Sequence, residues 1–486
     1  MRRKQLVFRP DTLYYGDCLD IMNAWEAGCV DLIYLDPPFN SSANYNILYG
    51  KDPAGKPRDE PAQFTAFKDT WFWNADAGRR VEEISRAAAH PAHRAIKGLA
   101  EMLPETGMLA YLVYMADRIV AMHRILKDTG SIYLHCDPTA SHYLKIIMDG
   151  VFGGRNFKNE IVWCYPPKGR GPKYGFHRKH DIILFYSKSA SSVFKRPYTE
   201  LNDAQIAKFS FTDEDGRRYK DFKGVRTYLD ESLGRPVPSW WTDIAATGQS
   251  RVESLGYPTQ KPIALLERII KASSNEDDVV LDPFCGCGTT AEAAYKLGRK
   301  LIGIDISPYA ITRICHDRLK HAEGVSIRGL PTDLESTRAM AEDDRLAFEQ
   351  WAVTTLPGFE PNEKQTGDGG IDGRGYLLNP PANEKGHCVV QVKSGGFTPD
   401  NVRALLSKIT GGHASMGIFV TMDKMRNTQT VRDCVFNAGQ FNEGAKTFNR
   451  MMFWSMEEHF ASAQLQLPAM AHPRTGKALQ EMIPAD

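Results

Sequence analysis

Residues 30 to 39 read Val30-Asp31-Leu32-Ile33-Tyr34-Leu35-Asp36-Pro37-Pro38-Phe39, an apolar run that ends in an acid, two prolines and an aromatic ring. The β-branched and aromatic residues predict a buried strand, and the Asp-Pro-Pro turn lies at its carboxyl end, where open α/β sheets bind ligands. The prolines lack N–H groups and leave their carbonyl oxygens free to accept hydrogen bonds. This turn is therefore a candidate site for an amine on a flat ring, such as a nucleobase. The alternative is an ordinary turn in which Asp36 only caps a helix.

The composition is that of a globular protein with more than one domain. A chain of 486 residues exceeds the usual size of a single core, so two or three domains are expected. No apolar run approaches the roughly 20 residues that a membrane-spanning helix needs, and the basic start Met1-Arg2-Arg3-Lys4 leads to no secretory signal. The nine cysteines form no C-x-x-C pair, which favours reduced thiols over disulfides or zinc. We expect a cytoplasmic protein without a membrane partner.

A second strand-and-loop unit begins near residue 278. A strand at 279–281 is followed by Asp282-Pro283-Phe284-Cys285-Gly286-Cys287-Gly288-Thr289-Thr290, which predicts a glycine turn leading into a helix. The next strand, 300–304, ends in Asp305, 19 residues after Gly286, the spacing at which a carboxylate meets ribose hydroxyls in doubly wound folds. A nucleotide-type cofactor is indicated. A dinucleotide-dependent dehydrogenase fits less well, because the third glycine is missing and Asp282 suits a cationic cofactor better than a pyrophosphate.

These two stretches together resemble the amino-group DNA methyltransferases that use S-adenosylmethionine. The catalytic box comes first and the cofactor box last, which is similar to the circular permutation of their β type. Further segments match along most of residues 10–325: the strand 130–137, the strand pair 159–165 and 180–186, and Thr259-Gln260-Lys261-Pro262 before a helix at 263–272. The resemblance implies a permuted doubly wound α/β sheet with an inserted target-recognition region.

The resemblance also implies roles for individual residues. Asp36 and the Pro37 carbonyl, with Pro38 beside them, would hold the target amine, and Phe39 would stack on a flipped base. The residues implied to line the cofactor are Asp282, Phe284, Gly286 and Gly288 at its amino-acid end, Asp305 on its ribose and Lys261 near its carboxylate. Asp at position 36 resembles the adenine-N6 enzymes more than most cytosine-N4 enzymes, so adenine is the expected target.

A basic stretch follows the catalytic box. Between Arg155 and Arg196 the chain has ten lysines and arginines but two acidic residues, as a phosphate backbone requires, although a solvated face remains the alternative. We read residues 163–247, which also carry many aromatic residues, as the target-recognition region. The candidate DNA-binding residues are Lys168, Arg170, Lys173, Arg178 and Lys179.

The carboxyl-terminal third carries a second set of polar residues. Asp372 lies in a glycine-rich turn, and the following strand, 388–393, contains Gln391 and Lys393. A carboxylate, an amide oxygen and an ammonium group around one point can hold Mg²⁺ and activate a water molecule against a phosphodiester. This set resembles the PD-(D/E)xK nucleases, in the Gln-x-Lys branch of the Mrr-like restriction endonucleases. The resemblance implies Asp372 and Gln391 as metal ligands, Lys393 as a catalytic residue and Glu349 as an acid on the first helix.

The expected fold is thus a permuted doubly wound α/β methyltransferase with a smaller α/β nuclease-like domain. The expected limits are 1–328 for the first domain, 329–344 for a linker, 345–460 for the second domain and 461–486 for a tail. S-adenosylmethionine, Mg²⁺ and double-stranded DNA are the expected cofactors and partner, and a homodimer stays open. The alternative is a methyltransferase whose second domain is inactive and only binds DNA or mediates dimerisation.

Overall fold

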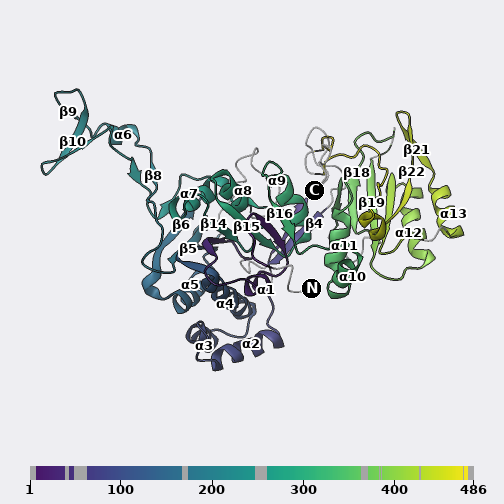
Figure 1. Ribbon diagram of the computed structural model, residues 1–486, viewed down its shortest axis with the longest axis horizontal. Helices are drawn as coiled ribbons and strands as arrows, with labels where there is room; N and C mark the ends of the chain where they lie inside the picture. The colour runs from purple at the N-terminus through teal and green to yellow at the C-terminus, as the bar shows by residue number, and fades with distance from the viewer. Residues whose placement is uncertain are drawn as a thin grey trace.

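The computed structural model of the chain (Figure 1) describes residues 7–38, 43–48, 63–69, 71–166, 173–246, 260–362, 370–381, 384, 386–425, 428–473 and 476–479. Within these ranges, no helix is both long enough and apolar enough to cross a membrane. Two sheets with flanking helices follow one another along the chain, a mixed sheet of nine strands and a smaller sheet of five. The predicted α/β class with a second, smaller α/β domain is confirmed.

The nine-stranded sheet brings the two stretches that decide the fold side by side. Its strand order is β13 (Trp240–Trp241), β6 (Phe157–Cys164), β7 (His180–Ser187), β5 (Leu126–Cys136), β2 (Val30–Leu35), β14 (Val279–Asp282), β15 (Lys300–Asp305), β1 (Thr12–Tyr15) and β16 (Ser326–Arg328). The strands from β5 to β16 run parallel to one another, whereas β7 is antiparallel to both of its neighbours. The carboxyl ends of β2, β14 and β15 therefore lie next to each other at one edge.

Strand β2 shows why its sequence is apolar throughout. All six of its residues are buried. Leu32 and Tyr34 pack into the core on one face of the sheet, and Ile33 and Leu35 into the core on the other. A parallel strand with helices on both faces has no solvent side, so no polar alternation is expected.

Helices cover both faces of this sheet. One core includes side chains from α1 (Cys18–Asn23), α3 (His93–Met102), α4 (Gly107–Ile125) and α5 (Ser141–Phe152), and α2 (Ala75–Arg86) adds one residue, Ile84. The other core includes side chains from α7 (Ile263–Ser273), α8 (Thr289–Lys296), a π-helical turn at Ala310–Cys315 and α9 (His316–Leu319). The predicted strands at 130–137, 159–165 and 180–186 and the predicted helix at 263–272 are confirmed as β5, β6, β7 and α7.

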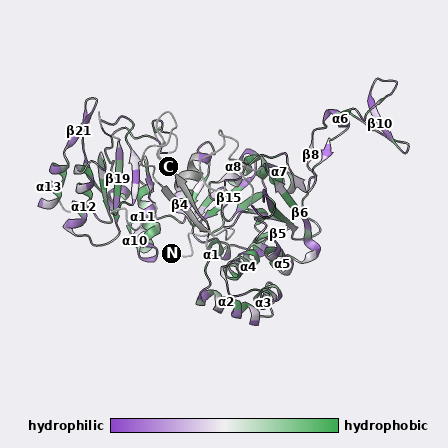
Figure 2. Cartoon of the chain, turned by 180° about the vertical axis from the view of Figure 1, so that it is seen from behind, coloured by the Kyte–Doolittle hydropathy of each residue, from purple (hydrophilic) through white to green (hydrophobic). Residues whose placement is uncertain are grey.

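An arm leaves this body between β7 and β13. It contains β8 (Tyr198–Thr199) paired with β12 (Arg235–Pro236), the short helix α6 (Asp203–Ile206), and a three-stranded sheet of β9 (Phe211–Thr212), β10 (Arg218–Phe222) and β11 (Val225–Tyr228). Figure 1 shows the arm projecting far from the nine-stranded sheet, and Figure 2 shows β10 coloured largely hydrophilic. A separate antiparallel hairpin pairs β3 (Ala43–Leu48) with β4 (Gln63–Asp69).

The second sheet has the order β17 (Phe359–Pro361), β18 (Gly373–Tyr376), β19 (His387–Lys393), β20 (Met416–Thr421) and β23 (Met451–Ser455). One of its two cores includes side chains from α10 (Leu334–Asp343), α11 (Arg345–Thr354) and α14 (Met456–Phe460), and the other includes α12 (Pro399–Thr410) and α13 (Gln429–Ala438). A hairpin of β21 (Gln440–Glu443) and β22 (Lys446–Asn449) follows α13.

Residues 329–344, expected to form a linker, contain helix α10. Its Met340 is buried in the core of the second domain, and Leu334 packs against that core. Capping by Asp333, whose side chain accepts from the Ser336 N–H, starts the helix. The acidic residues of this segment, which suggested a linker, lie on a helix whose apolar residues point to the second domain.

The junction between the two domains depends on a glycine. Tyr15 and Leu330 each pack against a core of the first domain and a core of the second. Gly329 has a φ of +91°, and a Cβ atom there would lie 2.3 Å from the backbone oxygen of Tyr15. Only glycine fits this backbone conformation and this close approach.

We expect Gly329→Ala to lower the thermal unfolding midpoint more than Gly324→Ala does. Gly324 has a similar φ of +77° but no atom within 4 Å of its added Cβ, so it reports the backbone strain alone, about 1–2 kcal/mol. Gly329→Ala adds the clash with Tyr15 to that strain. Equal shifts in a scanning calorimeter would mean that the junction adapts at no cost.

Candidate active site

Three acids gather at the carboxyl edge of the nine-stranded sheet. Asp36 directly follows β2, Asp282 ends β14 and Asp305 ends β15. These three strands are adjacent and parallel, so their ends meet. Asp36 and Asp305 both raise the pKa of Asp282 by their charge, in addition to the larger effect of burial. The sequence predicted these acids for one site, and the fold brings them together.

Asp36 is held by a lysine from the other half of the domain. Lys261 Nζ donates to Asp36 Oδ2 at 2.5 Å, and the two side chains keep 9% and 14% of their exposure. The second oxygen, Asp36 Oδ1, is buried and has no hydrogen-bond partner among the described residues. Pro37 is buried and Pro38 half-buried beside it. Lys261 was expected near a cofactor's carboxylate; the structure gives it an ion pair with Asp36, and the expected role stays a prediction.

Asp282 is buried with two donors around it. Thr290 Oγ1 donates to its Oδ2 at 2.5 Å, and the Phe284 N–H donates to its Oδ1 at 3.1 Å. These hydrogen bonds favour the charged form, yet burial outweighs them and raises the pKa of Asp282 to about 7. Phe284 itself is half-buried against the core on one face of the sheet.

Asp305 anchors the glycine turn. Its Oδ2 accepts from the Gly286 N–H and its Oδ1 from the Ser307 N–H, both at 2.8 Å. Burial raises the pKa of Asp305 to about 6. Gly286 and Gly288 adopt φ values of +47° and +71°, which a residue with a Cβ rarely adopts. The turn thereby folds tightly over the ends of β14 and β15 and leads into α8.

A buried polar network beside Asp36 was not assigned any role from the sequence. Tyr34 Oη and His135 Nδ1 lie 2.8 Å apart, and His135 Nε2 lies 3.0 Å from Asp181 Oδ2. Tyr165 Oη donates to Asp181 Oδ1 at 3.0 Å. Burial opposes the charge on Asp181, but its hydrogen bond from His135 and the other favourable contacts prevail and lower its pKa. An ionised Asp181 accepts from His135 Nε2–H, and with the proton on Nε2 the Nδ1 atom can accept from the Tyr34 hydroxyl.

This network joins strand β2 to the segment that follows β6. Tyr34 lies two residues before Asp36, and burial, followed by the charge of Asp36, raises the pKa of its hydroxyl. Tyr165 directly follows β6, near the start of the region predicted to recognise the target. From the sequence, His135 and Asp181 could be placed near the ends of two predicted strands. That placement does not tell which side chains they contact.

Part of the predicted DNA surface lies outside the described residues. Phe39, Lys168 and Arg170 belong to that part of the chain. Lys173 and Arg178 are exposed, and Lys179 is half-buried with its backbone oxygen accepting from the Tyr165 N–H. Tyr174 and Phe176, between these cations, are 82% and 98% exposed. Exposed rings among cations can stack on bases as well as pair with phosphates.

The second candidate site lies in the smaller sheet. Asp372 Oδ2 accepts from the Val392 N–H at 2.7 Å, between Gln391 and Lys393 on β19. Gln391 and Lys393 are two residues apart and therefore lie on the same face of the sheet. Gln391 is buried, and Lys393 is half-buried at the end of the strand. The structure thus brings the predicted Asp and Gln-x-Lys residues to one place.

Glu349, expected as the first-helix acid, is paired with an arginine. Arg345 Nε donates to Glu349 Oε1 at 2.7 Å on α11. This hydrogen bond, with the charges of Glu349 and then Asp372, raises the pKa of Arg345. Among the residues that the structure describes, no group of three or more His, Cys, Asp or Glu side chains is arranged to hold a metal ion. An amide such as Gln391 falls outside those four residue types.

Comparison with known families adds to this geometry. A family model described as DNA methylase matches residues 30–315, and a second, described as restriction endonuclease, matches residues 345–448. The type II methyltransferase M.EcaI of Enterobacter cloacae is 29% identical over 41% of the chain and 56% of its own length. The DNA adenine methyltransferase YhdJ of Escherichia coli K12 is 28% identical over 61% of the chain and 78% of its own length.

A solved structure aligns over a similar part of the chain. The M1.HpyAVI–SAM complex covers 63% of this chain and 98% of its own, with 18% identity and a TM-score of 0.35. The chain spans only about half the length of curated relatives such as M.EcaI, at 56%. The two family matches coincide with the two sheets and their helices.

We expect Asp282→Asn to stabilise the ligand-free protein above pH 7. The pKa of Asp282 is raised in the folded state, so the folded protein retains a proton that the unfolded chain loses as the pH rises from about 4 to 7. Stability therefore falls across this range, and the neutral amide avoids that loss, about 2–4 kcal/mol at pH 8. The difference in unfolding free energy should shrink toward pH 4. A difference that does not depend on pH would mean that Asp282 is ionised in the fold at no cost.

Proposed function

The chain belongs to the DNA methylase family, and we propose that it transfers a methyl group from S-adenosylmethionine to the N6 amine of adenine in double-stranded DNA. The observation that carries this proposal is the Asp36 carboxylate. One of its oxygens is buried and unpartnered among the described residues, at the end of a strand and beside two prolines. An acceptor in this state suits a donor from outside the protein, such as an exocyclic amine.

Asp36 would make the amine a better nucleophile. The lone pair of an aromatic amine is delocalised into the ring, and hydrogen bonds from its two hydrogens to Asp36 Oδ1 and the Pro37 carbonyl localise that lone pair. Asp36 would also stabilise the positive charge that builds on nitrogen during attack. Holding the amine in line with the methyl group contributes the orientation. Phe39 would cover the flipped base.

The cofactor residues fit a cationic ligand. S-adenosylmethionine supplies an electrophilic methyl group on a sulfonium. Asp282 is buried and Asp305 half-buried, and desolvation raises the pKa of each acid. A nearby cation favours their charged forms. We assign Asp305 to the ribose, Asp282, Phe284, Gly286 and Gly288 to the amino-acid end, and Lys261 to a position near the cofactor's carboxylate.

Adenine is favoured over cytosine by the acid at position 36. YhdJ, one of the relatives, is named as an adenine methyltransferase.

The DNA would be held by Lys168, Arg170, Lys173, Arg178 and Lys179 within a target-recognition region at about 163–247. We propose the first domain as residues 1–328, and the cytoplasm as the place where it meets host DNA.

We expect wild-type protein to produce N6-methyladenine, and Asp36→Ala to lower methyl transfer about a hundred- to a thousandfold, as when a transition-state hydrogen bond is lost. Cofactor binding should change little, because Asp36 serves the amine and the cofactor's carboxylate can pair with Lys261 in its place. Mass spectrometry of digested DNA measures the product, and calorimetry with S-adenosylmethionine measures binding. Asp20→Ala, which removes an exposed acid on α1, is the control. N4-methylcytosine alone would overturn the base assignment, and near-normal transfer by Asp36→Ala would remove it from the mechanism.

We propose that the second domain, residues 345–460, is a Mg²⁺-dependent endonuclease. Its match to the restriction endonuclease family and the convergence of Asp372 with Gln391 and Lys393 support this. The donor set fits a hard cation: Asp372 and Gln391 supply oxygen atoms, and Glu349 lies on the neighbouring helix. When bound there, Mg²⁺ would supply the activation of a water molecule. Lys393 would hold the phosphate and stabilise the charge that develops on it.

The alternative, a second domain that only binds DNA or joins two chains, also has an observation in its favour. The Arg345 guanidinium pairs with Glu349, and the charge of Asp372 acts on it as well. A cation that pairs with Glu349 and is attracted by Asp372 would compete with a metal ion for these acids. In this alternative the domain retains the fold without the hydrolysis.

We expect Lys393→Ala to abolish metal-dependent cutting of plasmid DNA and to leave methyl transfer unchanged, because the two sites lie on separate sheets. Nicking and linearisation with Mg²⁺ or Mn²⁺ are followed on unmodified plasmid and on plasmid first methylated by this protein. Lys446→Ala, an exposed lysine on β22 of the same domain, is the control. Wild-type cutting should be weaker on the methylated plasmid. An absence of cutting on every substrate would favour the alternative.

A further inference from the structure

A cavity opens at the carboxyl ends of β19 and β20, next to the proposed nuclease residues. Its volume is about 670 Å³, within the usual range for small-ligand sites. The wall begins at Ser394, the residue after Lys393, and continues at Thr421, which is paired in register with Lys393. None of the sequence motifs was assigned to this cavity.

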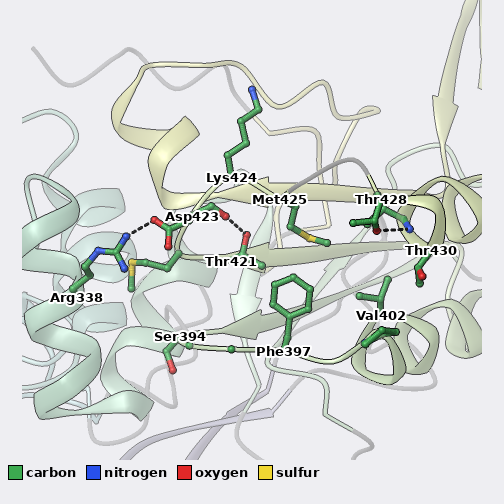
Figure 3. Close-up of a pocket in the computed structure, with 15 residues that line it drawn as sticks. Arg338, Ser394, Phe397, Val402, Thr421, Asp423, Lys424, Met425, Thr428 and Thr430 are labelled. Carbon is green, nitrogen blue, oxygen red and sulfur yellow. Dashed lines mark hydrogen bonds and ion pairs between the residues drawn. The ribbon is translucent and has the colours of Figure 1, made fainter.

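One part of the wall is apolar and carries an aromatic ring. Phe397 is 37% exposed and meets the buried Phe419 edge-on, with ring centroids 5.3 Å apart. Figure 3 shows the Phe397 ring pointing into the cavity from one side and Met425 from the other, with Val402 beyond them. The contact with Phe419 holds the Phe397 ring in place, and the exposed part of that ring is open to a ligand. An exposed ring and a thioether on two sides of the cavity can enclose a flat group, and the space between them is called the slot.

The remaining wall is polar and favours an anion. Helices α12 and α13, of 12 and 10 residues, both begin at the cavity, where Pro399 and Thr428 belong to its lining. Lys424 belongs to the lining with 66% of its side chain exposed, and its ammonium lies 3.5 Å from Glu458. Figure 3 shows this side chain pointing away from Phe397, so it must turn inward to meet an anion in the cavity. Arg338 from α10 lines the far side in an ion pair with Asp423 (Figure 3). The first N–H groups of the two helices add positive potential to that of Lys424.

We propose that this cavity binds one nucleotide, with its base between Phe397 and Met425 and its phosphate beside Lys424 at the starts of α12 and α13. A flat ring, a short linker and an anion match the slot, the volume and the polar end in one molecule. The nucleotide comes either from a DNA strand that runs past Lys393, with one base turned out of the stack, or from a free nucleotide. The strand source rests on the proposed nuclease function; the free source does not.

A nucleotide of a DNA strand bound at Lys393 would lie close to the cavity. Neighbouring nucleotides along one strand are spaced about 3.4 Å apart along the helix axis. Ser394, the residue after Lys393, lines the cavity, so a strand that passes Lys393 would bring a neighbouring nucleotide toward it. Any base could stack in the slot, because every base has a flat face. The fit of the base in the cavity would then distinguish one base from another.

The test uses the full chain without metal, and two pairs of matched variants. Phe397→Ala removes the ring face, and Phe436→Ala removes an 85% exposed ring on α13 that does not line the cavity. Lys424→Gln removes the cation, and Lys446→Gln is its control. The probes are deoxyadenosine monophosphate, measured by calorimetry, and two labelled 16-base-pair duplexes, one fully paired and one with a single unpaired adenine, measured by fluorescence anisotropy.

We expect Phe397→Ala to weaken binding at least about fivefold, the low end for loss of one base stack, and Lys424→Gln to weaken it about threefold. The two controls should bind as the wild type does. Weakened binding of the mononucleotide identifies a free nucleotide, and weakened binding of the unpaired duplex alone identifies a DNA strand. Equal binding of both probes by Phe397→Ala and Phe436→Ala would overturn the inference.

Failure of the nuclease proposal gives a different result. Wild-type protein that cuts no DNA, while Phe397→Ala still loses nucleotide binding, leaves the cavity assignment standing and removes the nuclease. Wild-type protein that cuts DNA, while Phe397→Ala binds and cuts as Phe436→Ala does, removes the cavity assignment and leaves the nuclease. Circular dichroism of each variant checks that its fold is retained.

Discussion

The ion pair between Asp36 and Lys261 holds the first domain's site together. Its two groups are 225 residues apart in the chain and almost fully buried. A buried charge without a partner is strongly destabilising, so the carboxyl end of β2 and the start of α7 must meet. The position of α7 in turn sets the position of β14 and of the glycine turn that follows it. One electrostatic requirement thereby joins the catalytic box to the cofactor box, which the permuted order of the chain separates.

The same edge of the sheet carries a cost that the rest of the fold offsets. Burial raises the pKa values of Asp282 and Asp305 to about 7 and about 6, although each accepts hydrogen bonds from neighbouring groups. Acids kept in such a state weaken the ligand-free protein at neutral pH, and a cationic ligand relieves the cost. The two large apolar cores on the faces of the sheet stabilise the fold and offset this destabilisation. Function at this edge and stability in the cores are therefore separate in space.

The sequence predicted the features that depend on residues close together in the chain, and it did not predict contacts between distant ones. Asp36, Asp282 and Asp305 follow apolar runs, so their place at strand ends was readable. The Asp36–Lys261 pair and the network of Tyr34, His135, Asp181 and Tyr165 join strands far apart in sequence, and no local pattern tells which side chains will meet. The arm at 198–236 has strands of two to five residues, too short for a period to show. Helix α10 was missed because its acids outweighed its apolar spacing.

The two proposed activities need a connection that the protein contacts do not provide. Tyr15 and Leu330 pack against cores of both domains, and Tyr15 is paired in register with Asp305, but neither residue belongs to the proposed catalytic set of either domain. A nuclease that cut the product of its own methyltransferase would destroy its host, so the state of the DNA itself must carry the signal. A methyl group changes the shape of one base edge, and a pocket discriminates one such group by about 1–3 kcal/mol. A cavity for a single nucleotide beside Lys393 is of the right size and in the right place to read that difference where the strand would be cut.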